Sequence, residues 1–177
     1  MRNVIYLILL GALLLTAALI TRSGILARKD PGRPINSAMR EALNAAKPQL
    51  ASDDAMLIAK TYGTAHKLAS GLHYVVRAPG TGEATPRLGG EVICHYDGRL
   101  LDGTPFDSSY RRGAPFVFRL GMGSVIRGWE EAFLTMHKGE KRTLIIPYWL
   151  AYGEKGRAPN IPPKATLVFE VELIDWR

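Results

Sequence analysis

The sequence predicts an α+β domain in its C-terminal part, in which an antiparallel β-sheet packs on one short amphipathic helix. Three observations predict it. Apolar and polar residues alternate in several short runs after residue 71. Turn sequences rich in glycine and proline separate these runs. One intervening stretch carries apolar residues at helical spacing. The 177 residues suffice for one such domain with additional segments.

The chain starts with an apolar segment. Residues 4–20 contain no charge, and a run of about 17 residues is near the minimum length of a membrane-spanning helix. Arg2 precedes the run, and basic residues follow it at positions 22, 28, 29 and 33. No small-x-small cleavage motif comes directly after it. We therefore interpret residues 1–29 as an uncleaved signal anchor with a basic flank, and a cleaved signal peptide is the alternative.

Two rules disagree about membrane orientation. A very short N-terminal head usually stays in the cytoplasm, which places the rest of the chain across the membrane. The greater number of basic residues after the apolar run favours the opposite orientation. We expect a single-pass membrane protein whose C-terminal domain is exported to the periplasm. The alternative is a soluble periplasmic protein after signal cleavage.

The formal net charge of +7 is unevenly distributed. Residues 1–69 contain 9 Lys and Arg against 4 Asp and Glu, whereas residues 70–177 contain 14 against 12. The basic excess therefore lies beside the apolar segment and indicates a membrane surface as its partner. No basic run is dense enough to predict binding of nucleic acid. The single cysteine, Cys94, excludes an intramolecular disulfide and a cysteine-based zinc cluster.

Residues 30–69 are predicted to form a linker with helical stretches. Pro31, Gly32 and Pro34 start it, and a first helix is expected from residue 36 or 37 to Pro48. A second helix is expected from Ser52 to about residue 68, with a glycine marking its end at position 71. Residues 36–69 form a stalk, pair with a second copy of the chain to give a homodimer, or form a solvated spacer, and these interpretations stay open.

Residues 70–177 are predicted to form the folded domain. The expected strands contain the following alternating residues: Leu72, Tyr74 and Val76; Val92, Cys94 and Tyr96; Phe116, Phe118 and Leu120; Leu144 and Ile146; and Leu167, Phe169, Val171 and Leu173. The expected helix carries Ile126, Trp129, Phe133 and Met136 on one face.

Several kinds of active site are excluded by their missing motifs. The sequence contains no phosphate-binding P-loop, no dinucleotide-binding glycine pattern and no G-x-S-x-G nucleophile motif. The four histidines are scattered without the spacing of metal ligands. We therefore expect neither a cofactor nor a metal. What remains is a set of aromatic residues held between turns, although most aromatic residues on strands only fill a core.

The sequence around these aromatic residues is distinctive. Residues 95–98 read HYDG, residues 102–109 read DGTPFDSS and residues 125–131 read VIRGWEE. Further along the chain come AYG at 151–153, IPP at 161–163 and ATLVFEVEL at 165–173. In order and spacing these segments resemble the signature blocks of the FK506-binding-protein family of prolyl isomerases. The resemblance covers about residues 70–176.

The resemblance implies a twisted antiparallel sheet wrapped around a short helix, with a shallow apolar pocket between them. It implies catalytic roles for Tyr96, Phe106, Asp107, Trp129, Tyr152 and Phe169, and substrate-binding roles for Arg112, Phe116, Val125, Ile126 and Ile161. Trp129 would form the floor of the pocket and Asp107 would lie at its rim. The Ile126 N–H would face the ligand. Macrolides of the FK506 and rapamycin type are implied as further ligands.

The implied activity is isomerisation of Xaa-Pro peptide bonds in protein clients during folding. It needs no nucleophile, because an apolar pocket that binds the twisted amide more tightly than the planar amide is sufficient. The alternative is a chaperone module that holds proline-containing segments, with incidental isomerase activity. Ser124, Arg157 and Asn160 depart from the residues common in the family. These departures bear on substrate preference and macrolide affinity.

Overall fold

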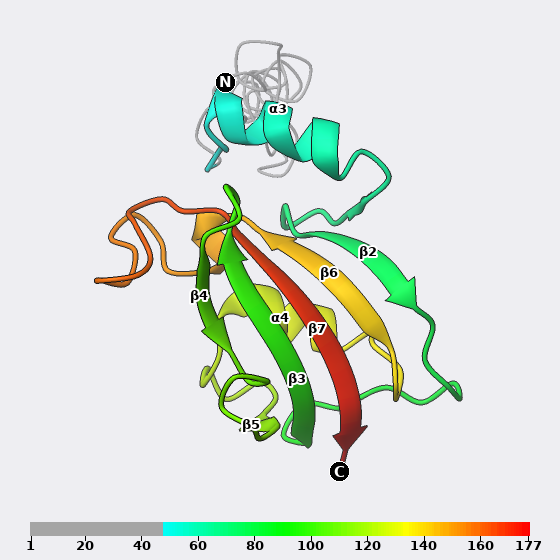
Figure 1. Cartoon of the computed structure of the whole chain (residues 1–177). Coiled ribbons are helices and arrows are strands. Elements are labelled where there is room, and N and C mark those ends of the chain that lie inside the picture. Colours follow the sequence, from blue (N-terminus) through cyan, green and yellow to red (C-terminus); the bar gives the residue numbers. More distant parts are fainter. Residues whose placement is uncertain (1–47) are drawn as a thin grey trace, which may run out of the picture. The chain divides into compact units, whose positions relative to one another are not determined.

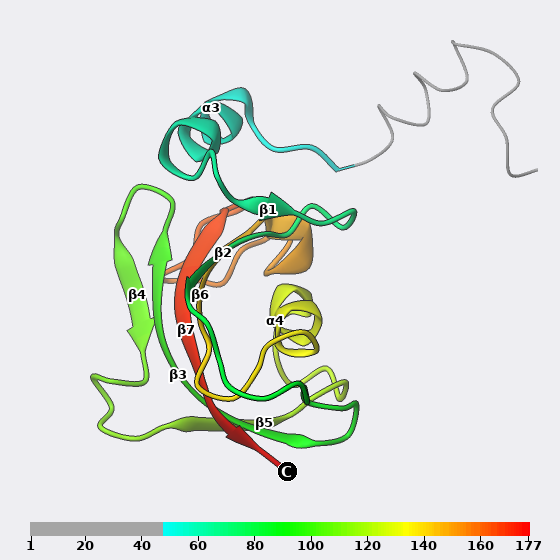
Figure 2. The same ribbon diagram turned by 90° about the vertical axis from the view of Figure 1, so that its right-hand side faces the viewer.

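The computed structural model describes residues 48–177. The predicted anchor and the first predicted helix lie outside the described residues. Within this part of the chain, no helix is both long and apolar enough to cross a membrane. Its seven strands form one antiparallel sheet that curves around helix α4 (Arg127–Phe133) (Figures 1 and 2). The predicted fold class is confirmed.

The sheet has the strand order β1-β2-β6-β7-β3-β4, and β5 pairs with the remaining part of β3. The strands are β1 (His66–Lys67), β2 (His73–Ala78), β3 (Glu91–Leu100), β4 (Pro105–Ser108), β5 (Phe116–Arg119), β6 (Lys141–Ile146) and β7 (Leu167–Trp176). Strand β3 is long enough for two partners along one edge. Its first half pairs with β5 and its second half with β4, while β7 pairs along the other edge.

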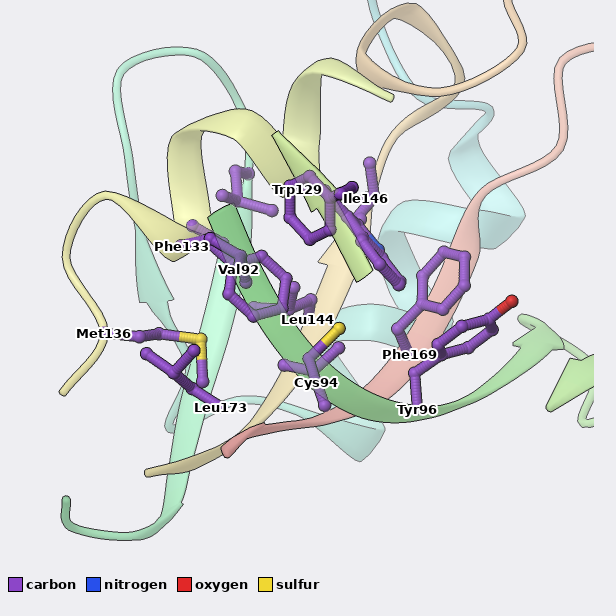
Figure 3. Close-up of a cluster of buried hydrophobic side chains, with 14 of the residues drawn as sticks. Val92, Cys94, Tyr96, Trp129, Phe133, Met136, Leu144, Ile146, Phe169 and Leu173 are labelled. Atoms are coloured by element: carbon purple, nitrogen blue, oxygen red, sulfur yellow. The ribbon is translucent and has the colours of Figure 1, made fainter. Parts of the chain in front are cut away.

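Side chains alternate between the two faces of the sheet because successive residues of a strand point to opposite sides. In β3, the side chains of Val92, Cys94 and Tyr96 are buried on the concave face. They pack with α4 and with the inward residues of β6 and β7, as Figure 3 shows for Leu144 and Phe169. The apolar residues that alternate in the predicted strands 92–96 and 167–173 are therefore core residues, as expected.

Helix α4 is shorter than the sequence pattern suggests. Trp129 and Phe133 are buried as expected, but the helix ends at Phe133, and Met136 reaches the core from the turn that follows. Gly128 lets the helix lie close to the sheet. A Cβ atom at this position would be 2.5 Å from Cγ2 of Ile146, so any larger residue would push the helix away from β6.

The second helix of the predicted linker also ends early. Helix α3 (Ser52–Thr61) stops seven residues before the expected end. Residues 66 and 67 instead form β1, which pairs with His73 and Tyr74 at the edge of β2. Without β1, the outer backbone groups of β2 would be unpaired, because β2 would be the edge strand of the sheet. Pairing with β1 provides hydrogen-bond partners for them, which a longer α3 would not do.

Helix α3 packs on the sheet of its own chain. Ile58 is buried against Ile145 and Val168, whose side chains leave the sheet on the face opposite α4. The Asp54 carboxylate accepts a 2.7 Å hydrogen bond from the Thr166 hydroxyl, immediately before β7. Helix α3 therefore contacts the chain just after the long loop 151–165.

A second contact lies just before that loop. The indole N–H of Trp149, in the 3-10 helix Tyr148–Leu150, donates a 2.8 Å hydrogen bond to the Ser70 carbonyl. The Ser70 hydroxyl in turn donates to Glu131 of α4 at 2.9 Å. The segment before β2 thus contacts the chain on both sides of loop 151–165, which carries residues of the site described below.

Replacing Ile58 with alanine should lower the free energy of unfolding by about 2–3 kcal/mol. This value is near the lower end for truncation of a buried isoleucine, because the apolar cluster under α3 is small. Met56→Ala on the same helix is the control, since its side chain is 65% exposed and should matter little. Urea denaturation of both variants measures the difference. Equal stabilities would show that α3 does not contribute through Ile58.

Candidate functional site

A cavity of about 390 Å³ opens at one end of the concave face. Residues from β3, β4, β5 and β7, from the start of α4 and from loop 151–165 converge there. The cavity is lined by Tyr96, Phe106, Asp107, Arg112, Phe116, Ser124, Val125, Ile126, Trp129, Tyr152, Arg157 and Phe169. Aromatic rings dominate this lining, and its charged groups are confined to two arginines and one aspartate.

The aromatic rings hold one another in place by edge-to-face packing. The ring of Trp129 lies 4.9 Å from that of Tyr96, with an angle of 80° between the planes, and 5.2 Å from that of Phe169, with an angle of 77°. Phe106 packs on Phe169 at 5.5 Å in the same way. Figure 3 shows Trp129, Phe169 and Tyr96 side by side at one end of the core. Such contacts stabilise a fixed ring orientation.

Gly98 makes room for two of these rings. A Cβ atom on Gly98 would lie 2.7 Å from Cε1 of Phe169 and 2.8 Å from Cζ of Phe106. A glycine inside a strand often marks such a close approach. The sequence pattern contained this signal within the HYDG block, but Gly98 was not among the predicted site residues.

Replacing Gly98 with alanine should displace the rings of Phe106 and Phe169. The domain should still fold, with a loss of about 1–3 kcal/mol in the free energy of unfolding, as is typical of overpacking. Binding of the Xaa-Pro peptides that the resemblance implies as ligands should weaken because the cavity walls shift. Urea denaturation and a peptide titration measure the two effects. The double variant Gly98→Ala, Phe106→Leu should regain part of the lost stability, and no recovery would contradict the proposed clash.

The rim of the cavity carries a hydrogen-bonded trio. The Tyr96 hydroxyl donates to the Asp107 carboxylate at 2.5 Å and accepts from the Arg112 guanidinium at 2.7 Å. Arg112 also donates directly to Asp107, and its Cζ lies 5.2 Å from the centroid of the Tyr96 ring. The N–H of Ser108 donates to Asp107 as well. These bonds fix the direction of both Tyr96 and Asp107.

The protonation states follow from these contacts. Burial raises the pKa of Tyr96 to about 12; its hydrogen bond to Asp107 adds to this shift and the one from Arg112 opposes it. Partial burial alone would raise the pKa of Asp107, but the Tyr96 hydrogen bond and the Arg112 charge outweigh it and lower that pKa. At neutral pH, Tyr96 is therefore a protonated donor and Asp107 an anion.

The backbone around Val125 and Ile126 is held from helix α4. The Glu130 carboxylate accepts hydrogen bonds from the N–H groups of Gly121 and Gly123. The Ile126 carbonyl accepts from Trp129 at the start of the helix. Within residues 48–177 the N–H of Ile126 itself donates no hydrogen bond. It lies in the cavity lining, as a donor for a bound peptide would.

Loop 151–165 closes one side of the cavity. Its tip is a tight turn in which the backbones of Arg157 and Ile161 exchange two hydrogen bonds, of 2.8 and 2.9 Å. The Arg157 guanidinium donates to the Tyr152 hydroxyl at 3.3 Å and lies 5.5 Å from the centroid of the Tyr152 ring. Ile161 is buried beneath the turn and does not line the cavity.

The structure thus brings ten of the eleven predicted site residues to one cavity, and Ile161 lies beside it. Ser124 and Arg157 line it in addition. The roles assigned to these residues remain predictions. Within residues 48–177, no three His, Cys, Asp or Glu side chains are arranged to hold a metal ion. The buried Nε1 of Trp129 has no hydrogen-bond partner in this part of the chain.

Comparison with known proteins agrees with this geometry. Residues 82–174, more than half of the chain, match the family described as FKBP-type peptidyl-prolyl cis-trans isomerase. The chain belongs to this family. Among FKBP-type relatives, it is 57% identical to human "Peptidyl-prolyl cis-trans isomerase FKBP2" over 88 residues, which are 50% of this chain and 62% of that protein.

Two further FKBP relatives extend the comparison. Arabidopsis thaliana "Peptidyl-prolyl cis-trans isomerase FKBP15-2" is 47% identical over 116 residues, which cover 66% of this chain and 69% of the relative. A solved structure, "Crystal structure of AtFKBP13", superposes with a TM-score of 0.60 and 39% identity. The superposed part covers 63% of this chain and 97% of the AtFKBP13 chain. The shared part is the FKBP domain; the chain spans less than two thirds of the length of human FKBP2.

Proposed function

We propose that this chain is a peptidyl-prolyl cis-trans isomerase that accelerates Xaa-Pro isomerisation in protein clients. The observation that carries the proposal is the aromatic cavity on Trp129, with the Tyr96–Asp107–Arg112 trio at its rim. The family match supports the same activity. No observation favours the alternative of a holding module over it.

The physical task is rotation about a bond with partial double-bond character. The barrier is roughly 18–20 kcal/mol, and uncatalysed exchange takes on the order of tens to hundreds of seconds. The twisted transition state has lost amide resonance and has less charge separation than the planar amide. An apolar cavity therefore disfavours the planar form more than the twisted form, and this difference accelerates rotation.

The lining suggests how the residues divide this work. The proline ring would lie on Trp129 between Tyr96 and Phe169, where its apolar surface is buried. The unpartnered N–H of Ile126 would donate to a peptide carbonyl and fix the segment beside the rotating bond. Asp107 would orient Tyr96 at the rim. No proton transfer is required in this scheme.

The test is cis/trans exchange of short Xaa-Pro peptides, observed on the peptide by NMR, with Phe, Leu, Ala or Glu before the proline. We expect catalytic amounts of the full chain in non-ionic detergent to speed exchange above the spontaneous rate. If the folded protein fails to accelerate any of these peptides, the proposed activity is wrong.

Indole signals locate binding in the same sample. The chain has three tryptophans, at 129, 149 and 176. With ¹⁵N-tryptophan labelling, a bound peptide should shift the indole signal of Trp129. The signal of Trp149, whose N–H is bonded to the Ser70 carbonyl outside the cavity, should stay in place. The opposite pattern would place binding elsewhere.

We also propose that macrolides of the FK506 and rapamycin type bind this cavity and compete with peptide. The apolar lining and the family match support this ligand class. Arg157 stands at the cavity edge, and its charge would face such a ligand. Inhibition of the peptide exchange by rapamycin measures it, and full activity at saturating macrolide would contradict it.

We infer from the sequence that residues 1–29 attach the domain to a membrane and that the domain is exported. The apolar run and its basic flank support this inference, although both lie outside the described residues. Protease treatment of intact cells and of spheroplasts that express a C-terminally tagged chain tests it. A tag that is degraded only after cell lysis would overturn export, and a tag that does not fractionate with membranes would overturn attachment.

A homodimer through residues 36–69 remains a proposal. Helix α3 packs on its own sheet through Ile58, and Met56 and Leu57 are the large apolar side chains of that helix that stay exposed. Sedimentation of the full chain in detergent, compared with a variant carrying Met56→Ser and Leu57→Ser, tests it. A monomer in both cases would exclude this dimer.

A further inference from the structure

Arg157 is the one cation of the cavity lining that forms no ion pair with a carboxylate of residues 48–177, and the Asp107 carboxylate acts on its charge only at longer range. Asp107 and Arg112, the other charged lining residues, pair with each other. Within residues 48–177 the Arg157 side chain makes a single hydrogen bond, of 3.3 Å to the Tyr152 hydroxyl, and a contact with the Tyr152 ring. A guanidinium has five N–H donors, so most of its donors face open space at the rim.

The surrounding loop does not supply the missing anion. Loop 151–165 contains one acidic residue, Glu154, and it pairs with Lys164 at 3.5 Å. Lys155 adds a further positive charge to the same loop. The Tyr152 contact and the Arg157–Ile161 backbone bonds hold the guanidinium at the rim, where it lines the cavity.

The size of the cavity determines which part of a peptide meets this charge. A cavity of about 390 Å³ is larger than one proline ring, so it also has room for atoms of the residues on either side of the proline, which leave it across the rim. Arg157 and Tyr152 form one part of that rim. A side chain next to the proline would therefore lie within reach of the free guanidinium.

We propose that Arg157 is a specificity-determining residue that selects clients with Asp or Glu next to the isomerised proline. This inference rests on the proposed isomerase function and names its preferred substrate class. The carboxylate would accept hydrogen bonds from the donors of Arg157 that Tyr152 leaves free, in the fork geometry that guanidinium and carboxylate groups share.

The expected preference is moderate because the site is open to solvent. Exposed ion pairs measured by double-mutant cycles correspond to about a two- to fivefold change in an equilibrium constant. The bond is remote from the rotating amide, so it should stabilise the planar and twisted forms alike. Binding that is uniform in this sense lowers KM and leaves kcat unchanged. The preference should therefore appear in Kd and KM.

The experiment compares isosteric peptides that differ only in charge. One pair has Glu or Gln directly before the proline, and a second pair has Glu or Gln directly after it. The full chain in non-ionic detergent is assayed for exchange by NMR and for binding by anisotropy of labelled peptides. We expect one pair to show a Glu preference of about two- to fivefold in KM and Kd. It should shrink at 1 M salt, where the Debye length is about 3 Å.

Variants assign the preference to Arg157. In Arg157→Gln the ratio of Glu to Gln affinity should fall to about one, whereas Arg157→Lys should retain only part of it, because the charge stays but the fork geometry is lost. Arg87→Gln is the matched control, because Arg87 is an exposed arginine outside the cavity lining and its loss changes the net charge equally. This control should keep the full ratio.

The outcomes separate this inference from the proposed activity. Acceleration of all four peptides with a ratio near one in both pairs would overturn the role of Arg157 and leave the isomerase intact. If Arg87→Gln abolished the ratio as Arg157→Gln does, general electrostatic attraction would replace a specific contact. If no peptide were accelerated, the isomerase proposal would fail, and the Kd ratio would still decide whether Arg157 selects acidic segments.

Discussion

Replacing Asp107 with alanine should lower kcat/KM for a proline peptide by about 10- to 100-fold. Asp107 accepts hydrogen bonds from the Tyr96 hydroxyl and from Arg112, so its loss frees the rim of the cavity to rearrange. Hydrogen bonds to a charged group contribute about 1.5–3 kcal/mol each, and about 1.4 kcal/mol corresponds to a tenfold change in rate. The side chain is partly exposed, which favours the lower part of the range.

The matched control is Asp102→Ala. Asp102 is an exposed aspartate in the turn before β4, where it accepts a hydrogen bond from the Thr104 N–H, and it does not line the cavity. Its loss should leave kcat/KM unchanged. If a folded Asp107→Ala variant kept activity within twofold of the parent, the rim trio would have no catalytic role.

Tyr96→Phe tests whether Asp107 acts through Tyr96. The variant keeps the ring that packs on Trp129 and removes the hydroxyl that Asp107 orients. If the two residues act as one unit, the double variant should lose little more activity than Asp107→Ala alone. Additive losses would mean that Asp107 acts on the peptide directly.

The fold of the C-terminal part could be predicted because its periodicities are strong. Alternation in 92–96 and in 167–173 places one set of side chains on the concave face, and β3 and β7 are the strands that form the centre of the core. The helix was placed correctly at Trp129 and Phe133 but extended too far. Met136 continues the apolar spacing although the backbone has already left the helix, because burial in a turn satisfies the same pattern.

Most of the site could be predicted from the family blocks, because the blocks fix which residue follows which turn. The blocks did not predict which side chains from different parts of the site come into contact. Arg157 and Tyr152 are five residues apart, and only the turn closed by the Arg157–Ile161 backbone bonds brings the guanidinium over the ring. Gly98 is a similar case, since the rings that approach it come from β4 and β7.

The sequence also did not predict that the ion pair of Glu140 and Arg142 is buried. Glu140 and Arg142 are two residues apart and resemble an ordinary surface pair in a strand with mixed polarity. In the structure their side chains are 4% and 7% exposed, and the Arg142 guanidinium bonds to Glu140 and to the hydroxyl and carbonyl of Thr135. It also lies 4.6 Å from the Tyr74 ring centroid. The network joins β6 to the turn after α4 and to β2.

Replacing Glu140 with alanine should therefore lower the free energy of unfolding by about 3–5 kcal/mol. That is the usual cost of removing one partner of a buried ion pair, because the other charge stays buried and unpaired. The Glu140 carboxylate also accepts the His137 N–H at 2.8 Å, so a partly buried donor would lose its partner as well. Urea denaturation at pH 7 measures the loss.

Two comparisons separate this cost from that of any lost ion pair. Glu154→Ala removes the carboxylate of the exposed pair with Lys164 and should change the stability by less than about 0.5 kcal/mol. The double variant Glu140→Leu, Arg142→Leu removes both buried charges and should recover much of the loss. A single variant Glu140→Ala as stable as Glu154→Ala would contradict the buried network.

The same network predicts how stability depends on pH. Burial alone would raise the pKa of Glu140, but the hydrogen bonds from Arg142 and from the His137 N–H outweigh it, so the folded-state pKa lies below its ordinary value of 4.5. A carboxyl group whose pKa is lowered by folding stabilises the protein above its unfolded-state pKa, and this contribution is lost as the pH falls through the folded-state pKa. The loss of stability between pH 7 and acid should therefore start near pH 4.5. It should be smaller in Glu140→Gln than in the parent, and equal pH profiles would mean that Glu140 is not the group that titrates.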